Sequence, residues 1–242
     1  IGFDDAGIGF MVAAYSALVL LAETPSGILA DRWSRKGVLM VASVFLAIAS
    51  LVNGLSTEPV LFIIGSLIWG AFFALYSGTY DSIVYDTVKE ETGEGTLYDK
   101  YFGRYRAVDS VALVSGALLG GALGQWLGLS VPFFLTIPLA FGAIFALSRF
   151  KEPQLHKEGR HENITAHVRE TVGMVLGRPA LFPLVALVVT LILTIIMLYE
   201  FNQLWFIALN LPPAWFGPAV SASLAASGAA GYFVSKIKSR VP

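Results

Sequence analysis

Four acidic residues lie inside or at the edge of long apolar stretches: Glu23, Asp81, Asp109 and Glu200. A carboxylate at the centre of a bilayer costs about 2.5–3.5 kcal/mol on insertion scales, so an acid at that depth indicates a proton, cation or substrate site. Glu23 is the deepest, because it lies about 12 Å along a helix from Asp31, which ends the first stretch. The other three lie close enough to the ends of their stretches to reach water. Glu23 is therefore the strongest candidate, although it shares a helix face with Asp31, so a structural role in a gate is equally open.

Polar and aromatic side chains accompany these acids. Tyr15 and Tyr80 lie in apolar stretches with acids of their own, and Asn202 and Trp205 follow Glu200. An anionic site flanked by aromatic rings suits an organic cation, and pockets for amphipathic ligands are apolar with a few placed polar groups. Because Trp and Tyr are also enriched at membrane interfaces, an anchoring role for Trp205 stays open.

Several kinds of chemistry find no support in the sequence. The chain has no cysteine, which excludes disulfides, thiolate metal sites and cysteine nucleophiles. It has no HExxH, nucleophile elbow or phosphate-binding glycine loop, so we expect no enzyme, no cofactor and no metal. The histidines, His156, His161 and His167, share one polar segment that reads as a solvated loop. Nucleic-acid binding is not expected, because the basic residues are split among several short segments.

The composition predicts a membrane protein. Hydrophobic residues make up 56% of the chain and charged residues 14%, whereas a soluble domain carries about 25% charged residues. A helical span needs about 20 mostly apolar residues, and lipid-facing backbone must be helical to satisfy its own hydrogen bonds. Seven segments qualify: 8–30, 37–54, 59–84, 107–127, 131–148, 180–203 and 214–234. The sequence therefore predicts an all-α, polytopic membrane helix bundle.

The basic residues give this bundle an orientation. All 16 Lys and Arg residues fall in the segments 32–36, 89–106, 149–178 and 236–240. Short loops rich in Lys and Arg stay cytoplasmic, so we expect these segments on the cytoplasmic side of a cell membrane and the intervening connections outside. Because those outer connections are only a few residues long, neighbouring helices should form antiparallel hairpins.

The longest polar segment, 149–178, suggests how the chain is divided. We interpret it as a cytoplasmic linker with one short surface helix, between a bundle in residues 1–148 and the start of a second bundle in 179–242. The chain begins at Ile1 without an initiator Met, and we expect it to be a fragment.

Residues 27–36, GILADRWSRK, carry a motif that resembles the loop signature of the major facilitator superfamily. The residues that match are Gly27, Asp31, Arg32, Arg35 and Lys36. Ser34 replaces the second Gly of the pattern, which leaves the tightness of that turn in question. The resemblance places the loop between helices 2 and 3 on the cytoplasmic side, where the charge distribution puts it independently.

The resemblance implies a register and a role for these charges. The seven segments would be helices 2 to 8 of twelve, with helix 1 and helices 9 to 12 missing. In the family, the Asp that matches Asp31 braces the two halves in the outward-facing state, and the Arg that matches Arg35 pairs with an acid at the inner end of helix 4. Asp86 is the matching acid here. The alternative is that these charges only mark an interface and fix topology.

A second, weaker resemblance lies in the segment 107–127. Its glycines, Gly116, Gly120, Gly121 and Gly124, resemble the glycine-rich motif of the family's proton-coupled antiporters, but Gly121 stands where Pro is usual. Small residues four apart also permit ordinary close helix packing, which is the competing interpretation. The antiporters carry an Arg inside helix 4 where this chain has Ser66, and no span here contains a basic residue. Any proton coupling must therefore use acids alone.

Together these features imply a secondary transporter that works by alternating access. We expect proton-coupled export of small amphipathic or drug-like molecules, with uptake of a sugar, peptide or other metabolite as the open alternative. The expected partners are a small-molecule substrate, protons and membrane lipids, and the expected state is a monomer. A seven-helix receptor is a distant alternative, since a retinal protein needs a Lys inside a span.

Overall fold

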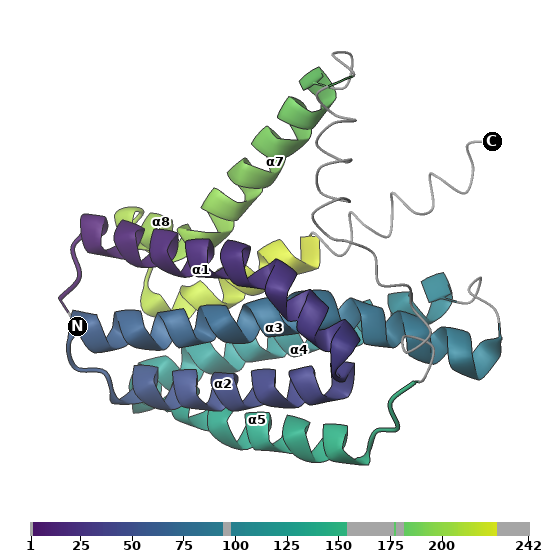
Figure 1. Cartoon of the computed structure of the whole chain (residues 1–242). Helices are drawn as coiled ribbons and strands as arrows, with labels where there is room; N and C mark the ends of the chain where they lie inside the picture. The colour runs from purple at the N-terminus through teal and green to yellow at the C-terminus, as the bar shows by residue number, and fades with distance from the viewer. Residues whose placement is uncertain (1, 94–97, 154–176, 178–181, 227–242) are drawn as a thin grey trace. The chain divides into compact units, whose positions relative to one another are not determined.

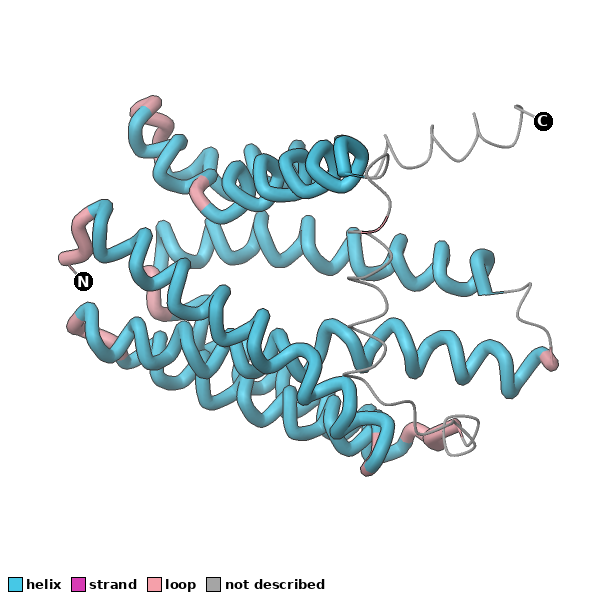
Figure 2. Tube along the Cα trace, turned by 45° about the horizontal axis from the view of Figure 1, so that its top comes forward, coloured by secondary structure: helices cyan, strands magenta, loops and turns pink. Residues whose placement is uncertain are grey.

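The computed structural model describes residues 2–93, 98–153, 177 and 182–226 (Figure 1). Within that part of the chain, every regular element is a helix, as Figure 2 shows. Two compact units can be separated, one within Ile1–Lys157 and Pro213–Pro242 and the other within Glu158–Pro212. The prediction of an all-α bundle is confirmed.

The first unit is built from five long helices. They are α1 (Asp5–Arg32), α2 (Arg35–Leu55), α3 (Pro59–Thr92), α4 (Tyr98–Leu127) and α5 (Val131–Arg149), followed later in the chain by a 3₁₀ turn, η4 (Pro213–Trp215), and a helix at Phe216–Ala226. Short connections make successive long helices antiparallel, so Arg32, Arg35, Lys89 and Arg149 gather at one end of the unit, called the basic end below.

Among the described residues, 6 helices are long and apolar enough to cross a membrane, by length and composition. They correspond to the first six predicted spans. The seventh, 214–234, is described only as far as the helix Phe216–Ala226, and its remainder lies outside the described residues. Most of the predicted linker, with its three histidines and its surface helix, also lies outside them.

Local signals explain where the helices begin and end. Asp4 caps α1 by accepting a hydrogen bond from Gly7 N at 2.7 Å. Pro59 occupies the first turn of α3, where its missing N–H costs nothing. α3 continues to Thr92, beyond the predicted boundary at 84, because polar residues still favour a helix outside the apolar layer. It stops at Gly93, whose φ of 67° is the left-handed conformation that favours glycine.

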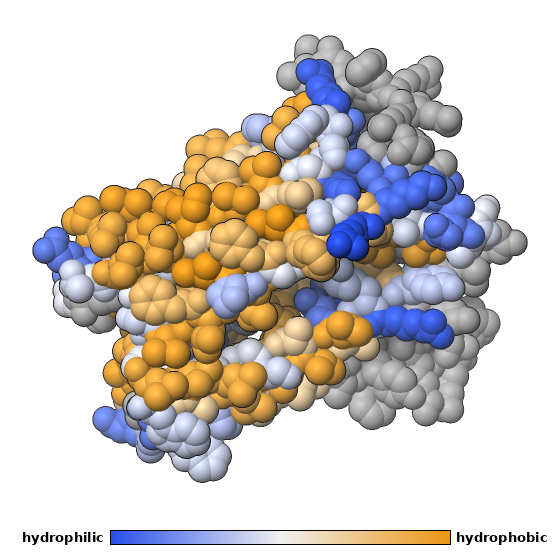
Figure 3. Space-filling view, turned by 90° about the horizontal axis from the view of Figure 1, so that it is seen from below, coloured by the Kyte–Doolittle hydropathy of each residue, from blue (hydrophilic) through white to orange (hydrophobic). Residues whose placement is uncertain are grey.

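The core of this unit lies along α2. This helix packs on α3 and α5, while α3 also packs on α1, and α4 makes fewer contacts with its neighbours. Small side chains permit the close approach, among them Ala42 and Ala49 on α2 and Ala74 on α3, each 1% exposed. Large apolar side chains such as Leu20 and Trp126 are exposed instead, and Figure 3 shows a broad apolar surface with hydrophilic residues toward the ends. This surface is typical of helices that face lipid.

The second unit contains α7 (Phe182–Glu200) and α8 (Asn202–Ala208). The segment 180–203 was predicted as one span, but the helix ends at Glu200 and a separate short helix starts at Asn202. The break is at Phe201, whose φ of −101° and ψ of 12° are not helical. The apolar pattern continues across this residue, so hydropathy alone could not locate the break.

Candidate functional site

Arg35 joins three helices at the basic end. Arg35 lies in the first turn of α2, and its Nη2 atom is 3.1 Å from Asp31 Oδ1 on α1. Its Nη1 forms an ion pair with Asp86 Oδ2 on α3 and donates to the Ser82 carbonyl oxygen at 3.0 Å. The side chains of Arg35 and Asp86 are only 13% and 11% exposed, whereas that of Asp31 is 64% exposed. The strong, shielded contact is therefore the one between α2 and α3.

This arrangement can act as an electrostatic latch. The planar guanidinium offers several donors in a fixed fork, so one Arg can hold two carboxylates and a carbonyl at once. We call Asp31, Arg35 and Asp86 the latch. The other three motif residues stay outside it: Arg32 is exposed, a Cβ at Gly27 would have no heavy atom within 4 Å, and Lys36 contacts the end of α5.

Ser34 explains how the turn tolerates the missing glycine. Its φ of −172° is extended backbone that any residue adopts, so no glycine is required. Its hydroxyl caps α2 by accepting a hydrogen bond from Gly37 N at 2.8 Å. The same hydroxyl donates to Glu152 Oε2 at 2.7 Å. Glu152 was not among the predicted site residues, because a glutamate at the start of a polar segment gives no signal that distinguishes it from a solvated side chain.

Lys36 reaches from α2 to the end of α5. Its Nζ donates to the carbonyl oxygens of Ser148 at 3.0 Å and Phe150 at 2.9 Å, and its backbone N–H donates to Glu152 Oε1 at 3.1 Å. The motif residue thus contacts a helix far away in the sequence, which its spacing alone did not reveal.

Glu23 faces α3. Ser77 Oγ donates to Glu23 Oε1 at 3.1 Å, and Ser26 Oγ, one turn further along α1, lies 2.6 Å from the Ala74 carbonyl oxygen. Pro25 lies between them inside α1, which bends along its length in Figure 1. Glu23 is exposed within this unit, and its role as a proton or substrate site stays a prediction.

A row of aromatic rings runs from α1 along α3 to α4. Ring centroids are 5.5 Å apart for Tyr15 and Trp69, 5.2 Å for Tyr76 and Tyr80, and 4.6 Å for Tyr80 and Tyr105. Phe72 bridges the first two pairs. We call these six residues the aromatic row. Ser77, which donates to Glu23, follows Tyr76 directly in the sequence of α3.

The other two candidate acids of this unit, Asp81 and Asp109, lie on α3 and α4. Asp81 lies 3.7 Å from Arg106 Nη2, with both side chains about half exposed. Asp109 interacts electrostatically with Tyr80 and Tyr105. Neither acid is inside a metal site: the described residues contain no group of three or more His, Cys, Asp or Glu placed to hold an ion.

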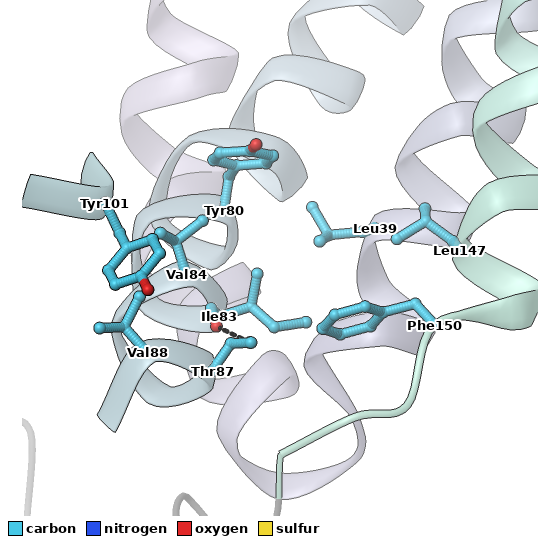
Figure 4. Close-up of a pocket in the computed structure, with 9 residues that line it drawn as sticks. All are labelled: Leu39, Tyr80, Ile83, Val84, Thr87, Val88, Tyr101, Leu147 and Phe150. Carbon is cyan, nitrogen blue, oxygen red and sulfur yellow. Dashed lines mark hydrogen bonds between the residues drawn. The ribbon is translucent and has the colours of Figure 1, made fainter. Parts of the chain in front are cut away.

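A cavity of about 360 Å³ lies between α2, α3, α4 and α5 at the basic end (Figure 4). Apolar side chains dominate its wall, and Tyr80 is the one predicted site residue on it. The lining residues are Leu39, Tyr80, Ile83, Val84, Thr87, Val88, Tyr101, Leu147 and Phe150. It occurs where α4 packs loosely on its neighbours, and it suits an apolar occupant.

The glycine-rich helix α4 meets the helix Phe216–Ala226 at one of the predicted glycines. A Cβ at Gly121 would lie 3.3 Å from Gly217 Cα, and Ser221 Oγ donates to the Val114 carbonyl oxygen at 3.4 Å. A Cβ at Gly124 would contact Leu129 at 3.4 Å, whereas Gly116 and Gly120 face open space.

The remaining candidates belong to the second unit. Glu200 ends α7, and Asn202 begins α8; both are half-buried, and Trp205 is exposed. Their role in a cavity stays a prediction.

Comparisons with known proteins agree with this architecture. The family model described as Major Facilitator Superfamily matches residues 1–242. Multidrug resistance protein 2 of Bacillus subtilis is 25% identical over 166 residues, which cover 68% of this chain and 39% of that protein. The efflux pump dotC of Dothistroma septosporum is 33% identical over 156 residues, 63% of this chain and 26% of the pump.

A third relative, the class H tetracycline resistance protein of Pasteurella multocida, is 27% identical over 147 residues, 60% of this chain and 35% of the relative. The chain thus spans well under half the length of these relatives. No solved structure gives a significant match.

Proposed function

This chain belongs to the major facilitator superfamily, and on that premise we propose that the full-length protein exports small amphipathic molecules across a cell membrane, driven by protons. The direction of transport is supported by the relatives, which are named as resistance proteins and efflux pumps. The observation that carries the proposal is the latch, in which Arg35 binds acids of two other helices at the basic end.

In this proposal the protein works by alternating access, as two bundles that rock about a central site. The basic end faces the cytoplasm, because Lys and Arg gather there. The latch stabilises the state in which that end is closed. Since Asp31 is exposed in this unit, it remains available to a second bundle, while Arg35 and Asp86 keep α2 and α3 together.

The binding region would lie along the aromatic row. Aromatic rings attract organic cations through their π-faces, and Glu23, which accepts from Ser77 on α3, would supply the negative charge. The same carboxylate could alternate between binding a proton and binding the cation, because one acid cannot hold both. This exchange would couple proton entry to export without a basic residue in any span.

The test is export of ethidium by the full-length protein, in cells stripped of their own efflux pumps. We expect loss of ethidium from loaded cells that stops when an uncoupler collapses the proton gradient. Asp31→Asn should abolish most of it, because the latch loses one of its two carboxylates. Glu58→Gln is the matched control: it removes an exposed acid at the opposite end of the bundle, where no side-chain cap bond is made.

No ethidium loss from a well-expressed, correctly inserted protein would contradict the proposed substrate class. Export that persists in the uncoupler would contradict proton coupling while leaving transport itself intact.

A further inference from the structure

Two sets of hydrogen bonds cross in opposite directions between the start of α2 and the end of α5. The Glu152 carboxylate, just beyond α5, accepts from Ser34 Oγ at 2.7 Å and from Lys36 N at 3.1 Å. In return, Lys36 Nζ donates to the carbonyl oxygens of Ser148 and Phe150. We call these five residues the clasp.

Both charges of the clasp suit the helix ends that they meet. Glu152 places a negative charge at the N-terminus of α2, and Lys36 places a positive charge at the C-terminus of α5. The helix macrodipole favours a negative charge at the N-terminus and a positive charge at the C-terminus, so both charges are stabilised. In addition, the hydrogen bonds that they make are charge-assisted, and such bonds are stronger than neutral ones. Because Glu152 and Lys36 are half-buried, salt screens them less than exposed charges.

The clasp surrounds Arg35 in the sequence. Ser34 and Lys36, its two neighbours, are both held by Glu152, so the backbone from which Arg35 projects is fixed on each side. The Arg35 guanidinium must reach Asp86 and the Ser82 carbonyl oxygen on α3 from that backbone. A shift of the first turn of α2 would therefore move the guanidinium away from both acceptors.

We propose that Glu152 is a positioning residue for Arg35, so that the chain leaving α5 sets the strength of the latch. The inference rests on the proposed function and adds a route of control to it. Displacing residues 150–153 withdraws the carboxylate from Ser34, frees the first turn of α2 and weakens the Arg35–Asp86 pair. Opening of the basic end then depends on the position of residues 150–153 as well as on the helices that carry the latch.

The experiment measures opening of the basic end without requiring transport. A cysteine replaces Gly27, whose Cβ position is open space one turn before Asp31, and its rate of labelling by a membrane-impermeant maleimide is followed from the side of the basic end. This chain has no cysteine of its own, and any cysteine elsewhere in the full-length protein is first replaced by serine. In the full-length protein, Glu152→Ala should raise the rate about threefold or more, as should Asp86→Asn, because both enlarge the open population.

Two comparisons separate positioning from a general loss of structure. Glu152→Gln keeps an oxygen that accepts from Ser34, so its labelling rate should fall between those of the parent and Glu152→Ala. Adding Glu152→Ala to Asp86→Asn should give no further increase, because both act on the same ion pair. The matched control is Glu91→Ala, which removes an exposed glutamate near the end of α3 at the same end of the bundle.

A parent-like rate in Glu152→Ala would overturn the inference. So would a double variant whose rate is the product of the two single effects, because Glu152 would then act independently of Arg35. If the Glu152 and Asp86 variants show the expected labelling rates but the parent exports no ethidium, the export proposal is contradicted and the inference about Glu152 stands.

Discussion

Arg35 of α2 and Asp86 of α3 form an ion pair whose two side chains are almost withdrawn from solvent, at 13% and 11% exposure. The pair connects the shortest turn of the unit, Trp33–Ser34, to the long helix that carries most of the aromatic row. Because each partner is shielded, the loss of one leaves the other charged and without its main compensation. Among the ion pairs of the motif, the Arg35–Asp86 pair is therefore the one expected to contribute most to the stability of the unit.

Asp86→Asn should lower the stability of the purified protein strongly. Removing one partner of a buried ion pair costs about 3–5 kcal/mol, and Arg35 would retain only the exposed Asp31 and one carbonyl. A thermal unfolding curve in detergent micelles measures the change. The double variant Arg35→Gln with Asp86→Asn should be less destabilised than the sum of the two single variants, since it leaves no unpaired charge. Additive losses would show that the two side chains do not depend on each other.

Asp81→Asn should have a much smaller effect, and it is the matched comparison for Asp86→Asn. Asp81 lies 3.7 Å from Arg106, with the two side chains 50% and 53% exposed. Exposed pairs of this kind contribute about 0–1 kcal/mol. The unfolding temperature of Asp81→Asn should stay close to that of the parent. A loss as large as that of Asp86→Asn would mean that Asp81 is shielded in the full-length protein.

The pairing of Arg35 with Asp86 was predictable because a family motif fixes the register of both residues. The clasp was not, since Glu152 joins α2 only through the packing of α2 on α5, and no local pattern encodes that contact. Hydropathy located the spans but not their ends: it stopped α3 at 84 and ran through Phe201. Side-chain caps and backbone conformation decide those boundaries, and they carry little hydropathy signal.

Gly217→Leu should disturb the packing of α4 on the helix Phe216–Ala226. A Cβ at Gly217 would lie 2.5 Å from the Ala117 carbonyl oxygen, so the helices would have to separate. Overpacking of this kind costs about 1–3 kcal/mol. Gly120→Leu is the control, because that position faces open space. The two unfolding temperatures should differ clearly, with Gly217→Leu the lower; equal values would contradict a close approach at Gly217.

Glu23→Gln should separate a direct role of Glu23 in export from a structural role in the gate. The amide can still accept the hydrogen bond from Ser77 Oγ, which lies 3.1 Å from the carboxylate in the parent, so α1 and α3 should keep their contact. It has no charge to attract an organic cation and cannot release a proton. We therefore expect ethidium export to fall about tenfold or more, which is a loss of about 1.4 kcal/mol of transition-state stabilisation. Insertion and unfolding temperature should remain those of the parent.

Ser77→Ala provides the contrast, because it removes the hydrogen bond but leaves the carboxylate, and it should retain most of the export. The measurement is the initial rate of ethidium loss for the parent and both variants at matched expression. Export by Glu23→Gln at the parental rate would assign Glu23 to the structure of the gate and leave Asp81, Asp109 and Glu200 as the remaining acids for proton coupling.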